Sequence, residues 1–508
     1  MPALSRLLLP LSAQARYNRP AVSLPCHRCL AISTVLLLVA LGAGACAVPL
    51  GPGYTVEKQT VNVHFVPSTP RIEVTTEFHL LNTGTQPLAA LEVLLPEQRY
   101  FHASELRFVL DGAALPGVVR VDDGSRVAQL TLPSAWGLRQ RHALQIACDL
   151  LRPGANLAQL DFSSDAFYLP AEDWVPQLLP PQGLFASGGA PPAQWDLFVS
   201  VPQGFLVHAS GEEAGRARAG EKVRVRFVQH ARDRYPFVTA GAYRESQMKS
   251  GSHRVHFWTR KAQDPARLQS VAESLSRALD AYDQLFGEHH SGRNVWIVEC
   301  PGLSGCARET AEYLQAAHRP GGITEAAFLD SSVLDLVQEP EALAAAAAPL
   351  LAVNWLGYEQ NAALGKQQAP LSELPDFAAN LGREAVQGPQ ARQEIIRAVL
   401  AVLPRQPTGQ RVQEREPAPE KSLLFFYALQ DEFGKAALSR ALRHMIEARR
   451  GRGFNLNDLI AALEQETHRN VAEFVRLWMK HPGVPAGFRA RYESQPASAA
   501  IFPKESTP

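Results

Sequence analysis

Two stretches mark where this chain changes its architecture. Residues 237–243 read FVTAGAY and end a series of short apolar or alternating runs, whereas residues 268–287 read LQSVAESLSRALDAYDQLFG. In the second stretch the apolar residues recur every three or four positions, which is the spacing of one helix face. The pair Phe286-Gly287 is a helix stop signal. The sequence therefore predicts a β-rich part before this point and a mainly helical part after it.

The β-rich part is predicted to be a sandwich domain over residues 54–243. Short strand-like runs recur through it, among them RIEVTTEFHLL at 71–81, HALQIACDL at 142–150 and KVRVRFVQH at 222–230. Turn residues such as Asn82-Thr83-Gly84 separate these runs. Many short strands with regular turn signals favour a β-sandwich.

The part that follows, over residues 244–488, is predicted to be mainly helical. The segment Glu341–Leu356 is apolar on almost all sides, which is typical of a buried helix. Ser422–Arg450 predicts one long amphipathic helix or two shorter ones, and Asn455 or Asn457 is a suitable N-cap for the next. Residues 489–508 are predicted to be a loose tail. The fold class expected from this order is a multidomain α+β chain.

Composition excludes one broad class of function. The 508 residues include 50 Lys and Arg and 50 Asp and Glu, so the formal net charge is zero. A nucleic-acid-binding protein usually carries a basic excess, so no nucleic-acid partner is expected. The 46% of hydrophobic and 20% of charged residues are ordinary for a globular protein.

Residues 1–46 have the features of a targeting segment. No acidic residue precedes Glu57, several arginines precede the apolar run Ala31–Leu41, and small residues surround Cys46. This pattern is typical of a secretory signal peptide, and the residues before Cys46 also resemble a loose lipobox. An uncleaved membrane anchor is the remaining alternative. In each case we expect an exported protein, periplasmic or extracellular, with the membrane as a partner if Cys46 is lipidated or the segment is retained.

The cysteines allow one disulfide and suggest no metal site. Cys300 and Cys306 are close enough in sequence to form a disulfide after export. Cys148 lies in an alternating run and is predicted to be a buried strand thiol. Cys26 and Cys29 have the spacing of zinc ligands but lack a second pair.

No familiar catalytic motif occurs in the sequence. There is no H-E-x-x-H, no G-x-S-x-G and no phosphate-binding P-loop. His253 and His256 lie in a strand-like stretch, where positions i and i+3 face opposite sides. We therefore expect each of them to be bonded locally or solvated, and not to bind a metal.

The order of elements and several motifs nevertheless resemble the aminopeptidase N family of zinc peptidases. FVTAGAY resembles the junction between the family's β-domain and its catalytic domain, and Asn354–Gly357 (NWLG) resembles the end of its zinc-binding helix. Residues 321–325 (GGITE) resemble its substrate loop, with Gly322 and Glu325 matching. The resemblance implies a thermolysin-like, mainly α-helical second domain. It also implies that Gly322 and Glu325 bind substrate, with Glu325 holding a free α-amine.

The positions that carry catalysis in that family are all replaced here. The two zinc-binding histidines fall on Pro349 and Val353, and the glutamate base between them falls on Leu350. The third ligand falls on Pro375 and the catalytic tyrosine on Pro419. None of these side chains offers a lone pair to a metal. Glu373 becomes available as a ligand only if the alignment shifts by two residues.

These replacements predict a catalytically inactive relative. We expect an exported protein that binds peptide or protein N-termini, or that acts as a scaffold, with no catalytic residue and no cofactor. The alternative is an active zinc-type aminopeptidase or hydrolase with a non-standard site, which would need zinc. A third possibility is a structural envelope protein that binds nothing in its cleft.

Overall fold

The computed structural model describes residues 53–493, apart from 70, 97–101, 123–124, 152–163, 170–173, 180–194, 230–236, 288–293, 301–325, 331–333, 335–337, 357–369, 404–417, 450–453 and 482. The predicted targeting segment with Cys46, the residues Gly322 and Glu325, and Cys306 lie outside the described residues. By its internal contacts the chain divides into Met1–Gly51 and Pro52–Pro508, and every described residue belongs to the second unit. Among the described helices, none is long and apolar enough to cross a membrane.

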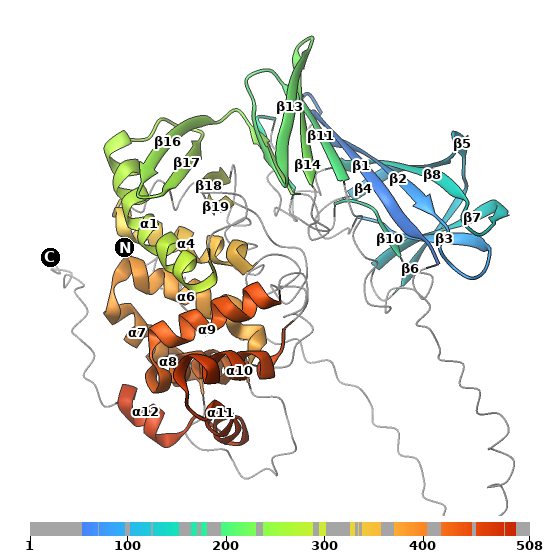
Figure 1. The fold of residues 1–508 in the computed structure, drawn as a ribbon. Helices are drawn as coiled ribbons and strands as arrows, with labels where there is room; N and C mark the ends of the chain where they lie inside the picture. The colour runs from blue at the N-terminus through green and yellow to red at the C-terminus, as the bar shows by residue number, and fades with distance from the viewer. Residues whose placement is uncertain are drawn as a thin grey trace, which may run out of the picture. The chain divides into compact units, whose positions relative to one another are not determined.

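The described residues of the N-terminal part form three sheets, and Figure 1 labels the strands of the first two. The largest has the strand order β13-β14-β11-β1-β2-β8-β4-β5. Its strands are β1 (Thr55–Val66), β2 (Arg71–Leu81), β4 (His102–Leu110), β5 (Ala113–Ala114), β8 (Arg141–Leu151), β11 (Trp195–Pro202), β13 (Glu212–Ala219) and β14 (Lys222–Gln229). The second, in the order β10-β3-β7-β6, contains β3 (Leu88–Leu94), β6 (Gly117–Asp122), β7 (Ser125–Trp136) and β10 (Gln177–Leu179). The third, in the order β12-β15-β9, contains β9 (Ala166–Leu169), β12 (Leu206–Ala209) and β15 (Val238–Gly241).

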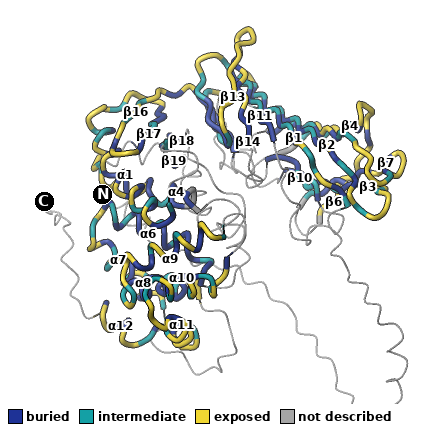
Figure 2. Tube along the Cα trace, viewed as in Figure 1, coloured by how far each residue is buried: buried dark blue, intermediate teal, exposed yellow. Residues whose placement is uncertain are grey.

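Alternation along these strands places their apolar residues in the interior. In β1, Val61 and Phe65 are fully buried whereas the residues between the buried positions are only partly covered (Figure 2). The buried residues form two separate clusters, one around Phe167, Trp174 and Trp195 and the other around Phe78, Leu130 and Trp136. The prediction of a sheet-rich N-terminal part is confirmed.

Cys148 lies in β8 with its thiol buried, as the alternating pattern predicted. Burial raises the pKa of this thiol to about 12, because a charged thiolate loses its hydration there. Cys148 is therefore an inert core residue and not a reactive cysteine.

The C-terminal part begins with a small sheet and one long helix. The sheet has the order β16-β17-β18-β19, in which β16 (Arg244–Ser250) and β17 (His253–Thr259) are antiparallel, and β18 (Asn294–Cys300) and β19 (Ala326–Asp330) continue it in parallel. Helix α1 (Pro265–Phe286) connects β17 to β18 and begins at Asp264, whose side chain accepts a hydrogen bond from the backbone N–H of Ala266. The helix ends at Gly287, where the sequence predicted it to end.

The other helices share one hydrophobic core with α1 and the small sheet. They are α4 (Pro340–Leu356), the 3-10 turn η2 (Leu371–Glu373), α6 (Leu374–Gln387), α7 (Pro389–Val402), α8 (Pro419–Phe433), α9 (Lys435–Ala448), α10 (Leu456–Thr467), α11 (Val471–Lys480) and α12 (Ala486–Glu493). The mainly helical C-terminal part is therefore confirmed.

Two helix boundaries settle choices that the sequence left open. The segment from Ser422 to Ala448 forms two helices and not one, because Gly434 adopts a φ of 90° between α8 and α9. Asn455 caps α10, and Asp458 completes the capping box.

The loose tail was predicted to begin at residue 489, but the chain is still helical there. Helix α12 continues to Glu493, with Phe488 and Tyr492 buried. The guanidinium of Arg489 bonds to the carboxylate of Glu493 (2.9 Å), so residues 489–493 are ordered by their own contacts.

Candidate functional site

Helix α4 is the element that the resemblance assigned to zinc binding, and its inner face is apolar. It packs against α1 and α6. Leucines, alanines and one tryptophan of α4 are at most 4% exposed: Leu343, Ala344, Ala347, Ala348, Leu351, Ala352 and Trp355. The helix contains no histidine, and its single ionisable residue is Glu341 in the first turn. The expected buried helix is confirmed, and it supplies core packing.

Two of the positions that the resemblance assigns to catalysis lie at helix starts. Pro375 lies in the first turn of α6 and Pro419 is the first residue of α8. Proline suits these places because its φ is already helical and a first-turn N–H has no partner within the helix. Pro375 is buried, whereas Pro419 is exposed. Both prolines therefore help to start a helix, and neither side chain has an atom that binds a metal.

Pro349 and Leu350, at two further positions that the resemblance assigns to catalysis, are half-buried in α4. Pro349 lies inside the helix, where it has no N–H for the carbonyl of Ala345 and where a proline costs about 3 kcal/mol. The side chain of Val353 lies outside the described residues. No polar group of Pro349 or Leu350 is available to hold or activate a water molecule.

Tyr282 of α1 contacts both α4 and α6, close to Pro349. Its hydroxyl donates a hydrogen bond to the carbonyl of Ala348 in α4 (2.9 Å). On the α6 side the tyrosine lies against Gly382, where a Cβ atom would come 1.7 Å from the hydroxyl oxygen. Glycine is therefore required at position 382, and the space between α1, α4 and α6 is filled by packing.

Glu373 lies two residues before Pro375, the position that the resemblance assigns to the third ligand. It is 4% exposed, at the end of η2, and its Oε1 accepts a hydrogen bond from the hydroxyl of Ser372 (3.1 Å). Burial raises the pKa of this carboxyl, and the charge of Glu420 raises it further. A raised pKa favours the protonated acid, whereas a metal needs the carboxylate.

Replacing Glu373 with glutamine should stabilise the protein at pH 8. The folded state holds the Glu373 proton more tightly than the unfolded state, so its contribution to stability is present at low pH and lost as the pH rises through the raised pKa. We expect Glu373→Gln to raise Tm at pH 8, by roughly 2–4 °C for each kcal/mol gained, and to change it little near pH 4. Glu341→Gln, at an exposed carboxylate, is the control. A lower Tm for Glu373→Gln at pH 8 would contradict the assignment.

A cavity of about 350 Å³ lies between the ends of α6 and α8. Its lining includes Glu384, Arg392, Gln430 and Lys435, and no residue of α4. Burial raises the pKa of Glu384, while Arg392 bonds to Asp431 (2.8 Å). This cavity is not part of the predicted site.

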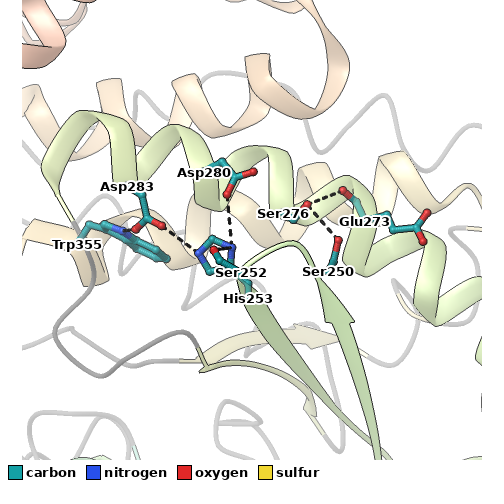
Figure 3. A network of polar contacts seen from close by, with 8 residues as sticks. All are labelled: Ser250, Ser252, His253, Glu273, Ser276, Asp280, Asp283 and Trp355. Atoms are coloured by element: carbon teal, nitrogen blue, oxygen red, sulfur yellow. Dashed lines mark hydrogen bonds and ion pairs between the residues drawn. The ribbon is translucent and has the colours of Figure 1, made fainter.

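A buried histidine at the start of β17 forms a polar cluster that the sequence did not predict. His253 is 2% exposed, and its Nε2 lies 3.2 Å from Oδ2 of Asp283 while its Nδ1 lies 3.6 Å from Oδ1 of Asp280. The indole N–H of Trp355 donates to Oδ1 of Asp283 (2.7 Å). Figure 3 shows both aspartates projecting from α1 toward the imidazole ring. The expectation of a locally bonded His253 agrees with these contacts.

The structure does not test the roles predicted for the remaining site residues. Gly322, Glu325, Cys46 and Cys306 lie outside the described residues. Cys300 ends β18, but its side chain is not described, so the disulfide with Cys306 is untested. His256 contacts Glu245 (2.8 Å) and Asn294 (3.3 Å), which agrees with the local bonding expected for it.

Comparison with known proteins identifies the fold. No protein-family model matches the sequence, and no curated protein matches it either. An M1 zinc metallopeptidase from Deinococcus radiodurans matches with a TM-score of 0.53 at 16% identity, over 86% of this chain and 96% of that chain. A mutant M1 zinc metallopeptidase from the same organism, bound to a Tyr-Ser-Ala substrate, has a TM-score of 0.54 at 17% identity and the same coverage. At these identities the likeness shows a shared fold.

Proposed function

We propose that this chain is a catalytically inactive relative of the M1 zinc metallopeptidases, which binds peptide or protein N-termini or acts as a scaffold. The observation that carries the proposal is the apolar inner face of α4. A zinc peptidase needs three protein ligands and an open metal position facing its cleft. Pro349 and Leu350 supply none of these groups, and Pro375 and Pro419 begin helices.

The binding role follows from the two residues that match the family's substrate loop. Glu325 is proposed to hold a free α-amine, and Gly322 to let the backbone approach the ligand closely. A carboxylate binds an ammonium group without a metal, so loss of zinc does not by itself remove this role. Export through residues 1–46, with lipidation at Cys46 or retention of the segment as an anchor, would place the binding site outside the cytoplasm.

Purified protein is expected not to hydrolyse amino-acid amides or short peptides. The physical reason is that no ligand set and no activated water are available at α4. Turnover is measured with added Zn²⁺ and with a chelator, and Glu373→Gln is assayed beside it because Glu373 is the third ligand that a shifted site would use. Chelator-sensitive turnover that Glu373→Gln abolishes would establish the active alternative in place of this proposal.

The binding role has its own test. A peptide with a free N-terminus should bind more tightly than its N-acetylated form, and Glu325→Gln should remove that difference, measured by calorimetry. If the two peptides bind with equal affinity, the protein does not recognise free N-termini, and of the two proposed roles only the scaffold role remains.

A further inference from the structure

The β16–β17 hairpin brings His253 to the last turns of α1. Gly251 has a φ of 58° in this turn, so the chain reverses sharply before Ser252 and His253. Asp280 and Asp283 are three residues apart in α1, which places them on the same helix face. The ring of His253 lies between their carboxylates (Figure 3).

We propose that His253, Asp280 and Asp283 bind one divalent transition-metal ion, such as Zn²⁺. One ligand atom from each residue lies within 4.8 Å of the others. The 3.2 Å between His253 Nε2 and Asp283 Oδ2 is close to the separation of about 3.4 Å between two ligands of a tetrahedral zinc ion. An imidazole with two carboxylates suits Zn²⁺ and similar ions, and leaves one position for water.

Asp280 is the ligand that completes the site. Its Oδ1 lies beside Nδ1 of His253 (3.6 Å), so its side chain must turn to reach an ion bound at Nε2, and its 54% exposure leaves room for that turn. The other two ligands are less exposed, His253 at 2% and Asp283 at 25%. Two fixed ligands and one adjustable ligand allow an ion to enter from solvent.

Neighbouring groups orient the two fixed ligands. The indole N–H of Trp355 holds Oδ1 of Asp283, which leaves Oδ2 directed at the histidine. The hydroxyl of Ser252 lies 3.4 Å from Nδ1 of His253, on the ring nitrogen that would not bind the ion. Such outer hydrogen bonds typically change metal affinity by about 10–100-fold.

The local charge also favours a cation. Two carboxylates and the carbonyl end of α1 meet at this point, and a helix C-terminus carries about half a negative charge. The guanidinium of Arg443 donates to the backbone carbonyls of Asp283 and Gln284 (2.6 Å each).

Zinc titration of the full chain tests the proposal. Metal-free wild type should bind one Zn²⁺ at this site, and Asp280→Asn should weaken that binding at least tenfold, measured by competition with a zinc-sensitive dye. Glu273→Gln removes one carboxylate from the same helix, outside the three ligands, and should leave the affinity unchanged. Cys26 and Cys29 are present in every variant, so any zinc they bind cancels in the comparison.

A second measurement reports the ligands directly. Co²⁺ in place of Zn²⁺ should give a visible d–d band that Asp280→Asn weakens, and Trp355→Phe should lower affinity by about tenfold through loss of its hydrogen bond. Equal Zn²⁺ affinity of wild type and Asp280→Asn, or no binding at all, would overturn the site and leave His253 as an imidazolium between two carboxylates. The outcome is independent of the proposed loss of catalysis, because the readout is metal affinity and not hydrolysis.

Discussion

Replacing Leu351 with alanine is expected to lower the free energy of unfolding by about 2–5 kcal/mol. Leu351 is 0% exposed and lies on the face of α4 that packs against α1 and α6. Truncation removes the transfer free energy of the buried side chain and leaves a cavity that well-packed neighbours cannot close. Urea and thermal unfolding of the purified variant measure the loss.

Leu350 supplies the matched control in the same helix. Its side chain is half-buried, so part of its apolar surface is already in contact with water. Leu350→Ala should therefore cost clearly less than Leu351→Ala, because less area returns to solvent. Equal losses for the two variants, or a parental melting curve for Leu351→Ala, would show that α4 does not pack as described.

Acid should destabilise the protein through His208 by up to about 5 kcal/mol. His208 in β12 is 7% exposed and stacks on Trp296 of β18, with ring centroids 4.0 Å apart. Burial lowers the pKa of this imidazole from 6.5 to about 3, with a smaller contribution from His256. Between these two values the unfolded state binds a proton that the folded state excludes. The contribution of neutral His208 to the free energy of unfolding is therefore fully present above pH 6.5 and is lost as the pH falls toward 3.

The variant His208→Phe isolates this effect, because phenylalanine keeps an aromatic ring and cannot be protonated. The difference in unfolding free energy between wild type and variant should be constant above pH 7 and shift in favour of the variant by about 1.4 kcal/mol per pH unit below 6. His79→Gln, at a half-exposed histidine, serves as the control. A pH-independent difference for His208→Phe would mean that the imidazole is accessible to protons in the folded state.

The sequence by itself determined the features that depend on neighbouring residues along the chain. Alternation placed Cys148 in a buried strand, helical spacing placed the end of α1 at Phe286-Gly287, and polar cap residues placed the start of α10 at Asn455 or Asn457, of which the structure selects Asn455. These signals are local, because strand and helix periodicity and capping involve only a few consecutive residues. The sequence also shows that the side chains of Pro349 and Leu350 in α4 carry no lone pair for a metal.

Tertiary structure alone decided which distant residues meet. Nothing in the sequence around His253 indicates that Asp280 and Asp283 face it, because that contact depends on how the β16–β17 hairpin packs against α1. The requirement for glycine at position 382 likewise appears only when Tyr282 is placed beside it. Such contacts arise from the packing of whole elements against one core, and packing is not encoded in the periodicity of any single segment.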